Sequence, residues 1–142
     1  MELVVVRHAE KAADGSDDPP LTDAGRRRAA LLADILGTPR LQAVYATSFR
    51  RTQQTAAPTA GINGLSVTSY DAKQPAQDFV AELRRAHAAG RVLVVGHSNT
   101  VPAIVAKLCA CEIAPMSEHE YDRLSIVYID AGGRARLEQR RY

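Results

Sequence analysis

The chain has 142 residues and a mass of 15.4 kDa, and its 46% hydrophobic and 24% charged residues are typical of a globular protein rather than a disordered or collagenous one. Eighteen Lys and Arg residues oppose sixteen Asp and Glu residues, and the formal net charge of +2 is too small for nonspecific binding to nucleic acid. An aromatic content of 5%, without Trp, also argues against a surface that stacks on bases.

Targeting and cysteine signals are weak. The apolar run Leu3–Val6 is too short for a signal peptide or a membrane span, so we expect a cytoplasmic protein without a membrane partner. Cys109 and Cys111 stand two residues apart, where we expect a disulfide to be geometrically unfavourable and both thiols to be reduced. Without repeats or a linker-like stretch, residues 1–142 are predicted to form a single domain.

The first elements alternate between strand and helix. The short apolar and β-branched run Leu3–Val6 predicts a strand buried on both faces. After a polar loop, Thr22 can cap an amphipathic helix that ends at Gly37. Leu41–Tyr45 then predicts a second strand.

The middle of the chain continues this alternation. Thr47 or Ser48 is expected to cap a helix that runs to about Ala57, where Pro58 stops it. Leu65–Thr68 is a weaker strand candidate.

The second half repeats the pattern and ends in a hairpin. We predict a helix from Pro75 to Gly90, a strand over Arg91–Val95, a helix after Asn99, and a hairpin of Leu124–Ile129 with Ala135–Leu137. Regular alternation of strands and helices predicts an α/β fold with a mostly parallel sheet.

Cationic and imidazole side chains follow three of the predicted strands. Arg7 and His8 end the first strand, Arg50 follows the second near a helix start, and His97 follows the strand Arg91–Val95. Ligands of open α/β sheets bind outside the carboxyl ends of the strands. Because arginine and histidine donate hydrogen bonds to anions, these four residues predict a pocket for a tetrahedral anion such as a phosphoryl group.

Three segments also resemble a known family. The strings R-H-A-E at 7–10, Y-A-T-S-F-R-R-T-Q-Q-T-A at 45–56 and V-V-G-H-S-N-T at 94–100 closely resemble the signature segments of the histidine phosphatase superfamily, also called phosphoglycerate mutase-like. The string L-T-D-A-G-R-R-R-A at 21–29 resembles the first helix of that family. The chain is most similar to the small phosphatase branch, which includes short bacterial phosphohistidine phosphatases.

The resemblance implies both a fold and a set of roles. The implied fold is a three-layer α/β/α sandwich, phosphoglycerate mutase-like. His8 would be the phosphorylated nucleophile, and Arg7, Arg50 and His97 would bind the phosphoryl group.

These residues suit phosphoryl transfer. Neighbouring cations keep the imidazole of His8 neutral and nucleophilic, and two arginines can fork onto phosphoryl oxygens in place of a metal. We therefore predict a metal-independent phosphatase with no cofactor that hydrolyses phosphomonoesters or protein phosphohistidine through a phosphohistidine on His8. Its partner would be a phosphorylated small molecule or a phosphoprotein.

The general acid that protonates the leaving group has no obvious position. The chain has Ala9 where the family commonly has Gly, and Ser98 where one branch has Asp. Asp71, in a loop, and Glu10, close to the first motif, are the candidates.

Three alternatives remain open. A phosphoglycerate mutase-type phosphoryl transferase would need insertions for which the chain between Arg50 and His97 leaves little room. A noncatalytic phosphate-binding module would explain the missing acid. A zinc or manganese site could use the side chains of His8, Glu10, His97 and His119, although no familiar ligand spacing supports it.

Overall fold

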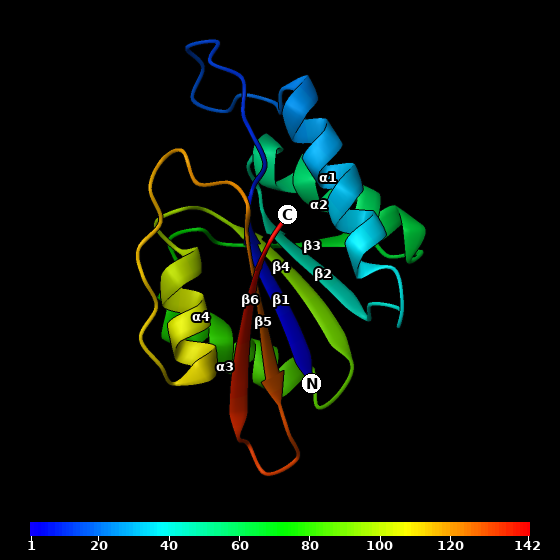
Figure 1. The fold of residues 1–142 in the computed structure, drawn as a ribbon, viewed down its shortest axis with the longest axis vertical. Coiled ribbons are helices and arrows are strands. Elements are labelled where there is room, and N and C mark those ends of the chain that lie inside the picture. The colour runs from blue at the N-terminus through cyan, green and yellow to red at the C-terminus, as the bar shows by residue number, and fades with distance from the viewer.

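The computed structural model describes residues 1–142 and is built on one sheet of six strands (Figure 1). The strands are β1 (Glu2–Arg7), β2 (Ala43–Thr47), β3 (Val67–Tyr70), β4 (Arg91–Gly96), β5 (Arg123–Ile129) and β6 (Ala135–Arg141). Their order across the sheet is β3-β2-β4-β1-β5-β6. Strands β1 to β4 are parallel, β5 is antiparallel to β1, and β6 is antiparallel to β5. The predicted mostly parallel α/β sheet is confirmed.

Four helices cover the two faces of the sheet. Helices α1 (Asp23–Leu36) and α2 (Arg50–Ile62) lie on one face, and α3 (Ala76–Ala86) and α4 (Val101–Cys109) lie on the other (Figure 1). This arrangement is the three-layer α/β/α sandwich that the resemblance implied.

Alternate residues of the central strands explain why both faces are covered. Val4 and Val6 pack in the cluster beneath α1 and α2, whereas Leu3 and Val5 pack in the cluster beneath α3 and α4. Successive strand residues point to opposite faces, so a continuous apolar strand needs an apolar layer on each side. The carboxyl end of β1 is thereby fixed at the centre of the molecule.

The start of α1 packs directly on the segment that follows β1. Thr22 caps the helix by accepting a hydrogen bond from the Gly25 amide, and its own amide donates to the Glu10 carbonyl. A Cβ atom at Gly25 would collide with that carbonyl. The glycine therefore allows the close approach that holds the chain beyond His8.

Helix α2 differs at both ends from the prediction. Its N-cap is Phe49, and Thr47 belongs to β2. The helix also continues through Pro58 to Ile62, although proline cannot donate a backbone hydrogen bond. Thr59 and Ala60 of this last turn are buried, and Ala60 packs in the core cluster on this face of the sheet.

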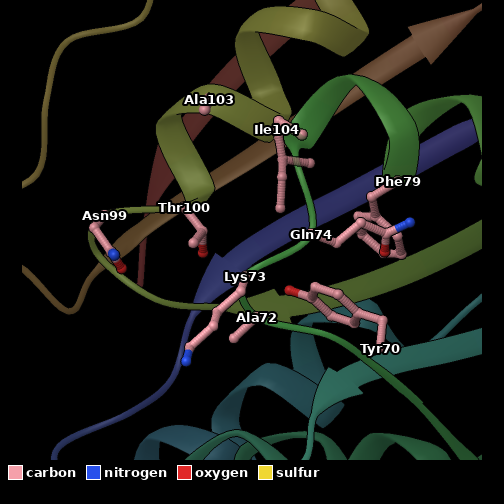
Figure 2. Close-up of a pocket in the computed structure, with 10 residues that line it drawn as sticks. Tyr70, Ala72, Lys73, Gln74, Phe79, Asn99, Thr100, Ala103 and Ile104 are labelled. Carbon is pink, nitrogen blue, oxygen red and sulfur yellow. The ribbon is translucent and has the colours of Figure 1, made fainter.

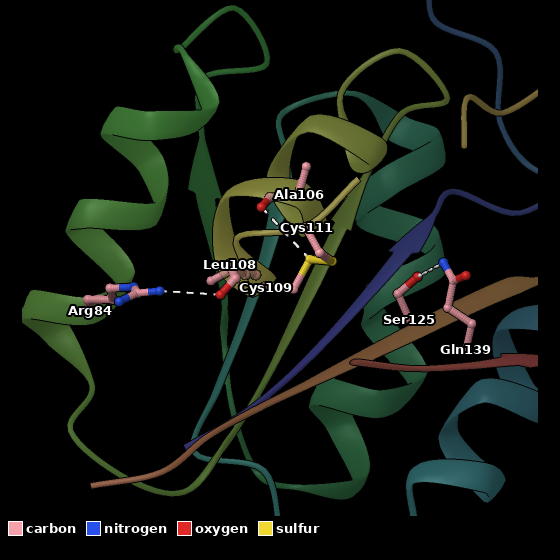
Figure 3. Close-up of a disulfide and its surroundings, with 7 residues drawn as sticks. All are labelled: Arg84, Ala106, Leu108, Cys109, Cys111, Ser125 and Gln139. Atoms are coloured by element: carbon pink, nitrogen blue, oxygen red, sulfur yellow. Dashed lines mark hydrogen bonds between the residues drawn. A yellow bond between two sulfur atoms is a disulfide. The ribbon is translucent and has the colours of Figure 1, made fainter. Parts of the chain in front are cut away.

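The prediction that the two cysteines are reduced is wrong in this structure, because Cys109 and Cys111 form a disulfide (Figure 3). Helix α4 ends at Cys109, and the left-handed backbone of its C-cap, Ala110 (φ of 52°), turns the chain back so that the amide of Cys111 donates to the Ala106 carbonyl. The two Cα atoms then lie 5.2 Å apart, within the range that a disulfide spans.

The remaining boundaries shift by a few residues. β3 begins at Val67 rather than Leu65, and β6 continues to Arg141. None of the helices has both the length and the apolar character needed to span a membrane.

Candidate functional site

A polar cavity of about 330 Å³ lies where β1 and β4 end. The predicted nucleophile, His8, and two of the predicted phosphate ligands, Arg7 and His97, line it. The other lining residues are Lys11, Arg51, Ser98, Asn99, Glu118, His119 and Tyr121. The carboxyl ends of two adjacent parallel strands therefore bring together side chains that are about ninety residues apart in the sequence.

His8 is positioned as a neutral nucleophile. Its ring is buried, and its Nδ1 atom lies 2.7 Å from the carbonyl oxygen of Ala9. A carbonyl only accepts hydrogen bonds, so Nδ1 carries the proton and Nε2 keeps a free lone pair. Burial, together with the charges of Arg7, His97 and Arg51, lowers the pKa of His8 to about 3. The imidazole is therefore uncharged at neutral pH.

The backbone around His8 is held by two further contacts. The amide of His8 donates to the carbonyl of Gly96 at 2.9 Å, and the amide of Ala9 donates to the Thr55 hydroxyl at 2.9 Å. Strand β4 and helix α2 together fix the carbonyl that orients the ring.

His97 lies beside His8, with 5.5 Å between the ring centroids. Its Nε2 atom is 2.9 Å from the Thr47 hydroxyl, and its amide donates to the hydroxyl of Thr100. Burial and the charges of Arg51, Arg7 and Lys11 lower the pKa of His97 to about 4. When Thr47 donates to Nε2, the proton of His97 resides on Nδ1.

Arg7 joins the cavity to a distant loop. Its Nη1 atom donates to the carbonyls of Glu118 at 2.8 Å and Glu120 at 3.0 Å, and its guanidinium lies 4.1 Å from the ring centroid of Tyr121. Its Nε atom is buried and has no partner in the protein. A buried, unpartnered donor costs free energy, so this N–H is suited to an incoming anion.

The structure corrects the assignment of Arg50. Arg50 is exposed at the first position of α2, where its amide donates to Asp18, and it does not line the cavity. Arg51 lines the cavity instead, with its guanidinium 4.5 Å from the Phe49 ring and a buried, unpartnered Nε atom. Consecutive helical residues point about 100° apart, so only one of the pair can face the strand ends.

Helical spacing could have selected the correct arginine. Arg51 shares a helix face with Thr55, four residues later, and Thr55 contacts the segment after His8. The apolar and small residues of this face predict which side of α2 meets the sheet.

Neither predicted general acid faces the cavity. Glu10 forms an ion pair with Arg28 of α1, with 2.9 Å between Oε1 and Nε. Partial burial acts to raise the pKa of Glu10, but the hydrogen bonds and charge of Arg28 outweigh it and lower the pKa. Asp71 is exposed, and its Oδ1 atom accepts from the amide of Lys73.

Glu118, which the sequence did not place in the site, lines the cavity together with His119, which the sequence offered only for the alternative metal site. They lie on the segment between α4 and β5, which Arg7 holds from one side. Arg123 holds the start of the same segment by donating to the carbonyls of Ala114 and Pro115. In the sequence, the polar run 118–123 is the feature that could have indicated that this segment lines the site.

The balance of charges suits an anion. Three cationic side chains, Lys11, Arg7 and Arg51, line the cavity with a single carboxylate, that of Glu118. The alternative metal site does not assemble, because no three His, Cys, Asp or Glu side chains gather closely enough to hold an ion. The arrangement can bind a tetrahedral anion against the free nitrogen of His8.

Comparison with known proteins was made for the sequence and for the fold. The family model described as histidine phosphatase superfamily (branch 1) matches residues 3–72, a segment that contains Arg7, His8 and Arg51. A curated relative, phosphoserine phosphatase 1 from Hydrogenobacter thermophilus, is 34% identical over 77 residues. That match covers 50% of this chain and 36% of the relative, so the chain matches only about a third of the length of that relative.

Solved structures match over nearly the whole chain. The protein histidine phosphatase SixA, solved with tungstate, is 25% identical with a TM-score of 0.84, and the match covers 99% of this chain and 97% of that one. A second protein that carries the SixA name, from Nakamurella multipartitia, is 26% identical with a TM-score of 0.76 and coverage of 98% and 94%.

Proposed function

Because the chain belongs to the histidine phosphatase superfamily, we propose that it hydrolyses phosphorylated substrates through a covalent phosphohistidine on His8. The observation that carries the proposal is the state of His8. A neutral ring whose Nδ1 proton is committed to the Ala9 carbonyl presents Nε2 as a nucleophile at the floor of a cationic cavity.

In this proposal Arg7, Arg51 and His97 hold the phosphoryl oxygens. The unpartnered Nε donors of the two arginines supply hydrogen bonds and positive charge where negative charge spreads over three oxygens. Fixed guanidinium groups supply the charge stabilisation that a metal clamp supplies in other phosphoryl-transfer enzymes, so we propose a reaction without metal or cofactor.

The reaction has two displacements. Nε2 of His8 forms a bond to phosphorus while the bond to the leaving group breaks, and the leaving group keeps the electron pair and takes up a proton from solvent. Water then attacks the phosphohistidine, the P–N bond breaks, and inorganic phosphate leaves while His8 returns to its neutral state.

The substrates that we propose are phosphomonoesters or protein phosphohistidine. The structurally similar SixA protein is a protein histidine phosphatase, and the curated relative is a phosphoserine phosphatase. We also propose that residues 1–142 act as one domain and that the protein works in the cytoplasm.

Rapid mixing with 4-nitrophenyl phosphate tests the proposal. We expect an acid-labile phosphoryl group on His8, located by mass spectrometry, and release of phosphate that is unaffected by chelators. The His8→Ala variant should carry no label and lose at least about a thousandfold in kcat/KM. Full activity in that variant, or binding of phosphate without any turnover of substrate, would contradict it.

A further inference from the structure

A second cavity, of about 240 Å³, lies between the segment after β3 and the start of α4 (Figure 2). Its walls are mostly apolar. Tyr70 and Phe79 stack with 4.0 Å between their ring centroids and form one side, and Ile104 and Ala103 of α4 form another. Nothing in the reaction proposed above uses these residues.

This cavity lies close to the phosphate cavity, because a third hollow shares lining residues with both. A smaller hollow between them is lined by Arg51 and His97 on one side and by Ala72 and Lys73 on the other. Asn99 lines all three spaces. A group attached to a phosphoryl unit in front of His8 therefore has a path along one groove toward Ile104.

Most polar side chains around the second cavity already form hydrogen bonds within the protein. The hydroxyl of Tyr70 donates to the Val95 carbonyl, the amide of Gln74 donates to Glu82, and the hydroxyl of Thr100 contacts His97. The side chains of Lys73 and Asn99 make no hydrogen bond to the protein, and Lys73 has no ion-pair partner. In Figure 2 both lie on the side of the cavity toward the end of β1.

The lining therefore combines an aromatic and aliphatic floor with one free cation. No carboxylate lines the second cavity or the hollow that joins it to the phosphate cavity. An apolar group gains free energy by leaving water for such a floor, and an anionic group gains from the ammonium of Lys73. The cavity is smaller than a pocket for a drug-sized ligand, which limits its occupant to about the size of one ring.

Building on the proposed function, we propose that this groove is the leaving-group subsite, and that the substrate is a small phosphomonoester with a ring-sized apolar group bearing an anion. The apolar group lies on Tyr70, Phe79 and Ile104. The anionic substituent faces Lys73.

Binding of phosphonates, which cannot be hydrolysed, tests the subsite without relying on catalysis. Calorimetry would compare methylphosphonate with phenylalkyl phosphonates that have one to three methylene groups, and with the same compounds carrying a 4-carboxylate. We expect at least one phenylalkyl compound to bind about tenfold or more tightly than methylphosphonate. The carboxylate should add about three- to fivefold.

Two substitutions from exposed positions separate the apolar and charged contributions. Ala103→Phe fills the cavity, so phenylalkyl phosphonates should no longer bind more tightly than methylphosphonate, while methylphosphonate itself still binds. Ala57→Phe, on an exposed face of α2 away from the groove, is its matched control. Lys73→Gln should remove only the additional affinity that the 4-carboxylate provides, and Lys107→Gln is the control.

The outcomes distinguish this proposal from the function on which it rests. If methylphosphonate binds but no phenylalkyl compound binds more tightly, or if Ala57→Phe acts like Ala103→Phe, the subsite is overturned and the phosphatase proposal stands. Faster turnover of a phosphohistidine protein than of any small ester, unchanged by Ala103→Phe, would also overturn it. If the increments appear but His8 is never phosphorylated, the subsite stands and the proposed function fails.

Discussion

At the scale of single residues, the site depends on which hydrogen-bonding atoms are already occupied. The Nδ1 atom of His8 is committed to a carbonyl, whereas Nε of Arg7 and Nε of Arg51 are buried without partners. The side chains of His8, Arg7 and Arg51 line one cavity, and each arginine has one donor that no protein atom occupies. The strand ends of the sequence indicated His8 and Arg7, but the sequence analysis chose Arg50 over Arg51, because adjacent arginines are distinguished by the helix face that packs on the sheet.

The two arginines of α2 provide a matched test. Arg51→Lys keeps the charge but loses the planar fork, and we expect kcat/KM for 4-nitrophenyl phosphate to fall by about 10- to 100-fold. Arg50→Lys should change it by less than about twofold, because Arg50 is exposed and outside the cavity. Circular dichroism would check that both variants fold. A loss in the Arg50 variant that equals the loss in the Arg51 variant would reject the assignment.

At the scale of elements, the site depends on how helix α1 and the loop before β5 pack against the segment that carries His8. The first turn of α1 rests on the carbonyl of Glu10, two residues beyond His8, and Arg28 of the same helix holds the Glu10 carboxylate. The loop before β5 reaches the cavity through Arg7. These contacts explain why Glu10 acts as a structural ion-pair partner rather than as an acid in the cavity.

Gly25 and Gly61 test this packing with the same substitution. Gly25→Ala should lower the free energy of unfolding by about 1–3 kcal/mol, because the new Cβ displaces α1 from the Glu10 carbonyl. Gly61→Ala, in the last turn of α2 with no atom nearby, should raise it by up to about 1 kcal/mol. Urea denaturation measures both, and equal effects in the two variants would show that α1 does not pack as closely as described.

At the scale of the whole molecule, the sheet buries two histidines in their neutral form. His8 and His97 have pKa values of about 3 and about 4 in the folded protein, mainly because of burial, against about 6.5 in an unfolded chain. Between these limits the unfolded state binds more protons than the folded state. The stability that the neutral histidines provide is therefore complete above about pH 6.5 and declines as the pH falls toward 4.

We expect the free energy of unfolding to be about 2 kcal/mol lower at pH 5 than at pH 6, since each buried neutral histidine contributes a slope that approaches about 1.4 kcal/mol per pH unit only well below pH 6.5. Urea denaturation at a series of pH values measures this slope. In a His8→Gln variant the slope should be about half as steep. A stability that stays constant between pH 6 and pH 5 would mean that the rings are not buried as neutral groups.

The sequence by itself determined the parts of this protein that depend on local pattern. Continuous apolar runs determined the central strands, and their alternation with amphipathic helices determined the layered fold. Arg7, His8 and His97 could be placed because Arg7 ends such a strand and the two histidines directly follow one, so a few neighbouring residues decide their position.

Tertiary contacts decided the rest. The position of Glu10 and Asp71 outside the cavity and the left-handed turn that pairs the two cysteines depend on how elements pack. The position of Glu118 at the cavity depends on the hydrogen bond from Arg7 to the Glu118 carbonyl, which joins residues 111 positions apart in the sequence. Sequence spacing carries little information about such contacts, because the angle at which two packed elements meet is set by side-chain volume and buried hydrogen bonds across the whole core.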